Sequence, residues 1–337
     1  MKNGYKYSVC CAVYNCEKYV EEAICSFLYQ TYTNIELILV DDCSTDNSYN
    51  ICKRYNDLYS NIILLKNECN CGPLVTKCKA INNASGDYIL FLDADDYLEH
   101  NAIEIINDNM NSNIDLIMFG CKKVDNNKKV IEEYKYEVGE YNDKNRNEFL
   151  MLVATNSIYN SICTKCVKNE IYKKIMDSCE GISINRGDDK YISSLLYKLT
   201  KNILILDNFL YNYRKNDQGI TVKSDGNYYI EYLDKENMKN LIYNDFSISE
   251  NEIQKYDKYQ VKQFKSQLIK ISTTKIEYSK IIKLFNDIKK ESYYNNTIKR
   301  LLKDCKLPIE ISLFTNNMYL LLIYMCKFKK FLYNLFK

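Results

Sequence analysis

The feature that most constrains the fold is an alternation of short apolar runs and amphipathic stretches over about the first 120 residues. Each apolar run has the length of a strand, and most are followed by apolar residues at helical spacing. Repeated strand and helix units of this kind form a mostly parallel sheet with helices on both faces. The predicted strands are Tyr7–Val13, Ile35–Val40, Asn61–Leu65, Tyr88–Leu92 and Asp115–Phe119, and the predicted helices are Glu17–Gln30, Ser48–Leu58, Leu74–Ala84 and Ala102–Met110.

The remaining two thirds of the chain change character twice. Residues 121–147 are charged and poor in apolar periodicity, which predicts a hairpin or an insertion. Ile203–Leu206 predicts a further strand, and from about Tyr228 the apolar residues recur at helical spacing. We therefore predict an α/β domain over residues 1–222, with a first half of about 1–120 and a second half of about 121–222, followed by an α-helical region over 223–337.

Composition narrows the class of protein. Hydrophobic residues make up 46% and charged residues 27%, as in folded soluble proteins, and the net charge of +2 gives no global field for nucleic acid. The 15 cysteines have no framework spacing and no signal-peptide pattern precedes them, so we expect free thiols in the cytoplasm. Cys163 and Cys166 form a lone C-x-x-C in a chain with one histidine, which favours plain thiols over zinc.

The stretch 318–337 has its own pattern. Met318–Cys326 is apolar, and Lys327–Lys337 is basic and aromatic. The apolar run is too short to cross a bilayer, which needs about 20 residues. An apolar helix followed by lysine and phenylalanine suits the membrane interface. Two interpretations stay open: peripheral contact with a membrane, and a C-terminal core helix with a solvated basic end.

Polar residues follow three of the predicted strands. Asn15 follows the first strand, Asp41–Asp46 the second and Asp93–Asp96 the fourth. In sheets of this kind ligands bind at the carboxyl ends of the strands. Three polar loops at one edge of one sheet therefore predict a binding site there. Ser44 or Asp46 is also a candidate N-cap for the helix that follows.

The acidic run after the fourth strand raises the question of a metal. Carboxylates this close repel and raise one another's pKa unless a cation joins them. Alternate residues of an extended segment point the same way, so Asp93 and Asp95 can share one face. Asp96 would then turn aside, to cap the helix at Ala102 or to orient the pair. Mg²⁺ or Mn²⁺ held by few protein ligands would stay open to a diphosphate, whereas a solvated acidic turn is the alternative.

At this point the chain resembles the inverting glycosyltransferases of family 2, which have the GT-A fold, of the type that builds bacterial surface polysaccharides. The resemblance covers about residues 5–222 and implies a Rossmann-like sheet. It also implies transfer of a sugar from a nucleotide-diphosphate donor, UDP-linked, to a hydroxyl of a surface-glycan or lipid-linked acceptor, with Mn²⁺ or Mg²⁺. The matching segments are Ser8–Ser48, Asn70–Gly72, Ala84–His100, Arg186–Lys198 and Tyr211–Thr221.

The resemblance implies roles for single residues. Asp42 should accept a hydrogen bond from the base. Asp93 should contact the ribose and Asp95 the metal, with Asp93 as a second candidate ligand. Asp189 should be the general base that takes the proton of the acceptor hydroxyl, and Asp188 should help bind the acceptor. The residues implied to line the nucleotide pocket are Ala12, Val13, Tyr14 and Ala94. Without the family context, Asp188 and Asp189 are read as caps of the following helix.

The chain departs from the family pattern at several positions. Lys77 stands where the family often has arginine, which keeps the charge expected near the diphosphate and loses the planar fork. Cys163 replaces a common tryptophan, while Lys165 is kept. His100 replaces a usual proline, and it either begins the next helix or ligates the metal. Arg214 either pairs with the diphosphate or is a surface arginine at a strand end.

Two other functions are compatible with a sheet that carries carboxylates. A nucleotidyltransferase would carry a glycine-rich loop after the first strand, and Ala12–Tyr19 has no glycine. A degenerate protein that binds a sugar nucleotide without turnover is allowed by the departure at Lys77. The retention of Asp93, Asp95 and Asp189 together argues against it. We expect a cytoplasmic enzyme, peripheral at the inner face of the cell membrane.

Overall fold

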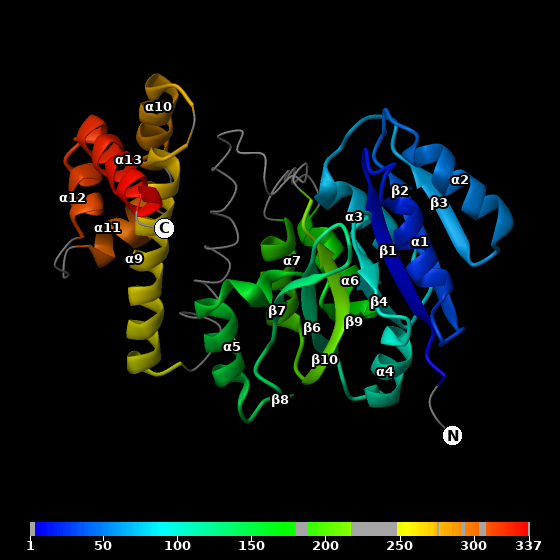
Figure 1. Cartoon of the computed structure of the whole chain (residues 1–337). Coiled ribbons are helices and arrows are strands. Elements are labelled where there is room, and N and C mark those ends of the chain that lie inside the picture. The colour runs from blue at the N-terminus through cyan, green and yellow to red at the C-terminus, as the bar shows by residue number, and fades with distance from the viewer. Residues whose placement is uncertain are drawn as a thin grey trace. The chain divides into compact units, whose positions relative to one another are not determined.

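A computed structural model describes residues 4–179, 188–216, 248–274, 276–290, 294–302 and 308–335. The chain divides into two compact units, Met1–Val222 and Lys223–Lys337 (Figure 1). The first unit combines strands and helices, and the second is helical in the part that is described. Arg186, Gly187 and Thr221 of the family-like segments lie outside the described residues.

One sheet forms the centre of the first unit. Its strands are β1 (Tyr7–Val13), β2 (Ile35–Asp41), β3 (Ile62–Lys66), β4 (Tyr88–Phe91), β5 (Tyr97–Leu98), β6 (Leu116–Val124), β7 (Val130–Tyr134), β8 (Gly139–Tyr141), β9 (Lys165–Lys168) and β10 (Ile203–Arg214). The strand order is β3-β2-β1-β4-β9-β6-β10-β5, with β7 paired to β6 and β8 to β10. The strands from β3 to β4 are parallel, and Tyr7 lies between Ile35 and Tyr88. The parallel sheet predicted for the first half is confirmed.

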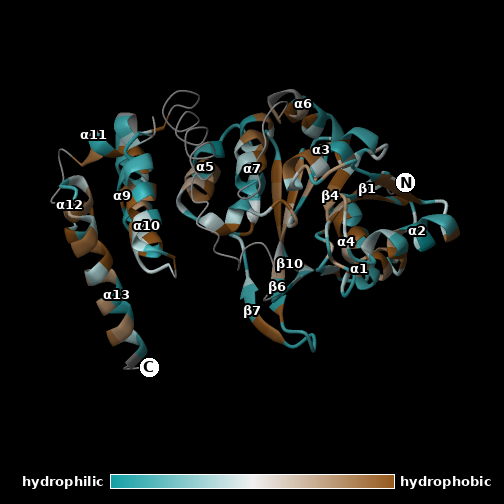
Figure 2. Ribbon diagram, turned by 90° about the horizontal axis from the view of Figure 1, so that it is seen from above, coloured by the Kyte–Doolittle hydropathy of each residue, from teal (hydrophilic) through white to brown (hydrophobic). Residues whose placement is uncertain are grey.

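Helices cover this sheet on both faces. They are α1 (Val20–Leu28), α2 (Ser48–Leu58), α3 (Pro73–Asn83), α4 (Ala102–Asn109), α5 (Arg146–Thr155), α6 (Asn169–Cys179) and α7 (Asp188–Leu199). The chain steps from β1 to β2 to β3 in one direction and returns to β4 in the other, which places α1 and α2 on one face and α3 on the other, where α6 packs beside it. All residues of β2 are buried for this reason. In Figure 2 the centre of the sheet carries the hydrophobic colour, whereas part of β7 is hydrophilic.

The second half of the sheet is mixed. β9 lies between β4 and β6 and runs antiparallel to both. The hairpin predicted in residues 121–147 is confirmed, because β6 and β7 pair antiparallel. The strand predicted over Ile203–Leu206 is longer and reaches Arg214. The polar pair Asp207 and Asn208 interrupts the apolar pattern there, and the pairing with β6 is irregular between Ile205 and Phe209.

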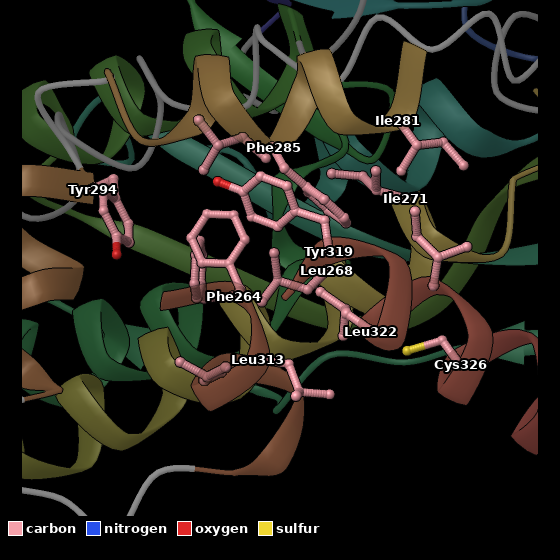
Figure 3. Close-up of a cluster of buried hydrophobic side chains, with 14 of the residues drawn as sticks. Phe264, Leu268, Ile271, Ile281, Phe285, Tyr294, Leu313, Tyr319, Leu322 and Cys326 are labelled. Carbon is pink, nitrogen blue, oxygen red and sulfur yellow. The ribbon is translucent and has the colours of Figure 1, made fainter. Parts of the chain in front are cut away.

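The second unit has a core of its own. Its helices are α9 (Glu250–Ser272), α10 (Tyr278–Ile288), η3 (Tyr294–Ile298), α11 (Lys299–Leu301), α12 (Ile309–Thr315) and α13 (Tyr319–Leu335). Phe264, Phe285 and Tyr319 meet in one buried cluster (Figure 3). Ser249 and Glu252 form a capping box at the start of α9. The helical region is therefore confirmed where it is described, and within those ranges no helix is long and apolar enough to cross a membrane.

Glu36 ties the start of the parallel sheet together from a buried position on β2. Its carboxylate accepts hydrogen bonds from the Ser8 hydroxyl (2.5 Å) and from the amide and hydroxyl of Ser85 (both 2.7 Å), and pairs with the Lys6 ammonium at 2.6 Å. Burial alone raises the pKa of Glu36, but these partners outweigh burial and lower the pKa to about 2.

This depressed pKa makes stability depend on pH. The folded pKa of Glu36 lies below its ordinary value of 4.5, so the stabilisation is complete above about pH 5 and is lost as the pH falls toward 2. We expect the contribution of Glu36 to lower the free energy of unfolding of the wild type by on the order of 2 kcal/mol when the pH falls from 7 to 3. Urea unfolding at both pH values measures the loss. Glu36→Gln should lack the part of this stability loss that comes from Glu36, whereas Glu133→Gln, at an exposed position of β7, should lose as much stability as the wild type. Equal pH dependence in all three proteins would contradict the assignment.

Candidate active site

The loops after β1 and β2 form one connected block at the carboxyl edge of the sheet. The Asn15 side-chain oxygen accepts the Thr45 amide at 2.8 Å, and the Asn15 amide donates to the Ser44 hydroxyl at 3.1 Å. Asp46 accepts the amides of Glu17 and Ser48, both at 3.0 Å. Ser44 and Asp46 therefore join the two loops. The N-cap residue of α2 is Asn47, without a side-chain cap bond, so neither Ser44 nor Asp46 is the N-cap residue; the Asp46 carboxylate nevertheless accepts the first amide of the helix, that of Ser48.

The predicted pocket residues on this block differ in exposure. Ala12 is half-buried, Val13 is buried, and Tyr14 is 41% exposed. The Val13 carbonyl accepts the Asp42 amide at 2.8 Å. Only Ala12 and Tyr14 thus present side chains toward solvent, and Val13 can reach a ligand only through its backbone. Their contact with a nucleotide stays a prediction.

Asp42 organises the loop that leads into α3. One carboxylate oxygen accepts the Asn67 side-chain amide and the Cys71 backbone amide, both at 2.8 Å, and the other accepts the Gly72 amide at 2.9 Å. Gly72 has a φ of 85°, a left-handed conformation that favours glycine at this turn. Asp42 is buried and already has three donors from its own chain. The sequence did not predict these contacts of Asp42 within its own chain. The predicted hydrogen bond between Asp42 and the base stays a prediction.

The acidic loop after β4 is held against β10 by Asp96. Asp96 accepts the Tyr211 hydroxyl and the Arg214 amide, both at 2.7 Å, and the Asp93 amide donates to the Tyr211 oxygen at 3.1 Å. Asp96 is buried, while Asp93 and Asp95 are half-buried. The prediction that Asp96 caps the next helix was wrong, because α4 has no side-chain cap bond. Sequence reasoning missed Tyr211, although it opens the last family-like segment.

Arg214 is locked in place beside this loop. Its side chain is 4% exposed and forms an ion pair with Glu22. Its Nε donates to the Asp95 carbonyl at 2.9 Å, and the guanidinium lies 5.4 Å from the ring centres of both Tyr19 and Tyr97. The interpretation of Arg214 as a surface residue was therefore wrong. Its contact with a diphosphate stays a prediction.

Lys77 joins α3 to the carboxylate pair that opens α7. Its ammonium lies 2.6 Å from an Asp188 oxygen and 2.8 Å from an Asp189 oxygen. The Lys77 side chain is 6% exposed, Asp188 12% and Asp189 30%. Sequence reasoning placed Lys77 near the diphosphate and missed this pairing. Of the two carboxylates, Asp189 is the more open to solvent.

The carboxylates around Lys77 carry more negative charge than it neutralises. The pKa of Asp93 is raised to about 6: burial is the largest cause, the nearby Lys77 ammonium opposes the rise, and the charges of Asp189 and Asp95 add to it. A divalent cation would offset this repulsion, and hard oxygen donors are the ligands that Mg²⁺ and Mn²⁺ prefer. Asp93 and Asp95 thus fit a metal by their chemistry. Across the described part of the chain, no group of three or more His, Cys, Asp or Glu is arranged to hold a metal ion.

Lys165 supports the same region from inside β9. It is buried, and its ammonium donates to the carbonyl oxygens of Tyr159, at 2.8 Å, and Ser161. Burial lowers the pKa of Lys165 to about 7. Lys165 therefore fixes the turn η1 (Ser157–Asn160), which packs against α7. His100 is exposed and lies just before α4.

The fold is shared with a protein of known structure. Over 86% of this chain and 73% of the other, the structure is similar to that of S. aureus TarS residues 1–349 in complex with UDP, with a TM-score of 0.52 and 20% sequence identity. An α/β unit of this type with a following helical region is the GT-A arrangement predicted from sequence, and the fold class is confirmed.

The sequence model of glycosyl transferase family 2 matches residues 8–176, and the chain belongs to this family. It is 26% identical over 224 residues to glycosyltransferase GlyA of Streptococcus pneumoniae, covering 62% of this chain and 30% of that protein. It is 29% identical over 225 residues to the minor teichoic acid biosynthesis protein GgaB of Bacillus subtilis, covering 64% of this chain and 24% of that protein. The chain thus spans less than a third of the length of these two relatives.

Proposed function

We propose that the protein transfers a sugar from a UDP-linked donor to a hydroxyl of a surface-glycan or lipid-linked acceptor, with inversion, at the cytoplasmic face of the cell membrane. The observation that carries the proposal is that Lys77 contacts Asp189 at 2.8 Å and that the charges of Lys77, Asp189 and Asp95 all act on Asp93, at the carboxyl edge of the sheet. Family membership supports the reaction class. The name of GgaB supports a cell-surface polymer as acceptor, and TarS was solved with UDP.

In this proposal Asp189 is the general base. The acceptor hydroxyl must lose its proton as it attacks the anomeric carbon, and a carboxylate within hydrogen-bond reach can accept it. Asp189 is the partly open member of its pair, whereas Asp188 is nearly enclosed and holds Lys77. We assign Asp188 to supporting the acceptor side through this contact. A single displacement without an enzyme nucleophile inverts the anomeric centre.

The donor would bind across the three loops at the sheet edge. Ala12, Tyr14 and the Val13 backbone would line the base, which Asp42 would orient through the loop it holds. Asp93 and Ala94 would face the ribose and diphosphate, and Asp95 with Asp93 would hold Mn²⁺ or Mg²⁺. When bound, that ion would neutralise charge on the leaving diphosphate. Arg214 would keep the Asp95 backbone in position for this.

One observation favours a second candidate, a sugar-nucleotide-binding protein without turnover. Lys77 already contacts Asp189 at 2.8 Å, and a base held by an ammonium is a weaker proton acceptor. In a turnover-competent enzyme this contact would have to loosen when donor and acceptor bind. Sugar transfer by the purified protein separates the two candidates.

Donor binding should depend on Asp95 and a divalent ion. We expect a UDP-sugar with Mn²⁺ to raise the melting temperature of the wild type, because a ligand at about 100 times its Kd stabilises by about 2.7 kcal/mol. Asp95→Ala should lose the part of the shift that needs Mn²⁺. Glu133→Gln, at an exposed position of β7, should behave like the wild type. The absence of any shift with nucleotide sugars and either ion would overturn the proposed function.

A further inference from the structure

The helix α13 has two unlike sides. Its inner side, with Leu322, Ile323 and Cys326, is buried in the core of the helical unit, where Figure 3 shows Leu322 and Cys326 among the clustered side chains. Its other side leaves large apolar side chains in solvent, and Figure 2 shows hydrophobic colour along most of the helix. The exposed fractions are 60% for Leu320, 52% for Leu321, 72% for Tyr324, 58% for Phe328 and 60% for Phe331.

These exposed side chains form a continuous stripe. Leu320, Tyr324, Phe328 and Phe331 are spaced by four, four and three residues, which aligns them along one face of an α-helix. Leu321 lies within the same sector at the start of the helix. We call these five residues the outer stripe. A run of aromatic and aliphatic side chains exposed in this way marks a surface that binds something apolar.

The charges around the outer stripe indicate what that surface is. Lys327, Lys329 and Lys330 lie on the same helix, and the sequence from Ile311 to Lys337 contains no aspartate or glutamate. Lys329 is held at 2.9 Å by Glu310, and the Lys327 ammonium lies 4.4 Å from the centre of the Tyr278 ring. Lys330 is exposed. Basic and aromatic side chains around an apolar stripe complement a bilayer with anionic headgroups.

We propose that the outer stripe lies in the boundary between headgroups and acyl chains of an anionic phospholipid bilayer, with α13 parallel to the membrane plane. The inner side of α13 stays in the protein core, because Leu322 and Ile323 are 0% and 1% exposed. The helix therefore attaches the chain without crossing the bilayer. The outer stripe is the surface that contacts the membrane in this proposal. Its binding to the bilayer does not depend on sugar transfer.

The test uses the full chain and vesicles of phosphatidylglycerol mixed with phosphatidylcholine, in a flotation assay. The wild type should float with these vesicles. Its binding should be weaker in added salt and with vesicles of pure phosphatidylcholine. Replacing Leu320, Tyr324, Phe328 and Phe331 by serine should lower vesicle affinity more than about tenfold, because their apolar area no longer leaves water. Lys330→Glu should weaken binding to the anionic vesicles alone.

Matched controls separate this proposal from other outcomes. Serine at Tyr29 and Leu58, which are 75% and 69% exposed in the α/β unit, should leave vesicle binding unchanged. The stripe variant should keep its far-UV circular dichroism and its melting shift with a UDP-sugar, since its replaced side chains face solvent. A wild type that stays with the soluble fraction overturns the proposal, as does a stripe variant that still floats. If the wild type is a dimer that does not bind vesicles and the stripe variant is a monomer, the proposal is overturned and the outer stripe is the contact with a second copy of the chain.

Discussion

Replacing Asp189 by asparagine should lower the rate of sugar transfer by about 10²–10⁴-fold, the range typical for loss of a general base. Asparagine has the same shape but cannot take the proton of the acceptor hydroxyl. The donor-induced melting shift should survive, because Asp93, Asp95 and the loops after β1 and β2 are unchanged. The measurement is transfer from a radiolabelled nucleotide sugar under conditions in which the wild type turns over.

Asp188→Asn is the matched control for this prediction. It removes one carboxylate from the same ion pair, yet it leaves the partly open carboxylate of Asp189 in place. Its effect on the rate should be smaller than that of Asp189→Asn. If Asp189→Asn transfers sugar as fast as the wild type, another group is the base. If the wild type binds donor but transfers nothing to any acceptor, the non-catalytic candidate is favoured.

Replacing Lys77 by methionine should destabilise the fold by about 3–5 kcal/mol, as expected when a buried ion pair loses one partner. Methionine fills a similar volume, so the cost comes from Asp188 and Asp189, which would lose their ammonium contacts at 2.6 and 2.8 Å. Urea unfolding measures the change as a lower midpoint at an unchanged slope.

The pH dependence of that loss identifies its cause. Burial raises the pKa of Asp188, and Lys77 opposes this rise. Without Lys77, the pKa of Asp188 in the folded state should rise further above its value in the unfolded state. The variant should therefore lose stability as the pH rises through this folded-state pKa. The Lys77→Met deficit should therefore be larger at pH 8 than at pH 5. A deficit independent of pH would point to packing and not to charge.

An exposed ion pair provides the control for Lys77. Lys53 and Asp57 lie 2.8 Å apart on α2, with side chains 54% and 53% exposed. Solvent screens such a pair, so Lys53→Met should destabilise the fold much less than Lys77→Met. The loss of stability in Lys77→Arg should lie between those of Lys77→Met and Lys53→Met, because arginine keeps the charge but brings a larger, planar group into a closed site. Equal costs for Lys77→Met and Lys53→Met would contradict the role of Lys77.

The sequence by itself predicted most elements of residues 1–120 and the edge of the sheet where the candidate site lies. Apolar runs such as Ile35–Asp41 become strands because their length and continuous hydrophobicity demand burial on both faces. The acidic residues after β2 and β4 then lie at the carboxyl edge, because parallel strands all end there. These features are local or follow from topology, so periodicity and motif spacing are enough to predict them.

Only the tertiary structure decided which charges meet. Lys77 reaches Asp188 across 111 residues of sequence, Tyr211 reaches Asp96 across 115, and Arg214 reaches Glu22 across 192. Periodicity records whether a side chain is buried, but a charged group's partner depends on how distant elements pack. The insertion of the short strand β9 between β4 and β6 is likewise a matter of long-range pairing. These contacts place Lys77 beside the proposed base and Arg214 beside Glu22. The sequence had left Arg214 either beside the diphosphate or at the surface, and the family resemblance had implied only that Lys77 contacts the donor.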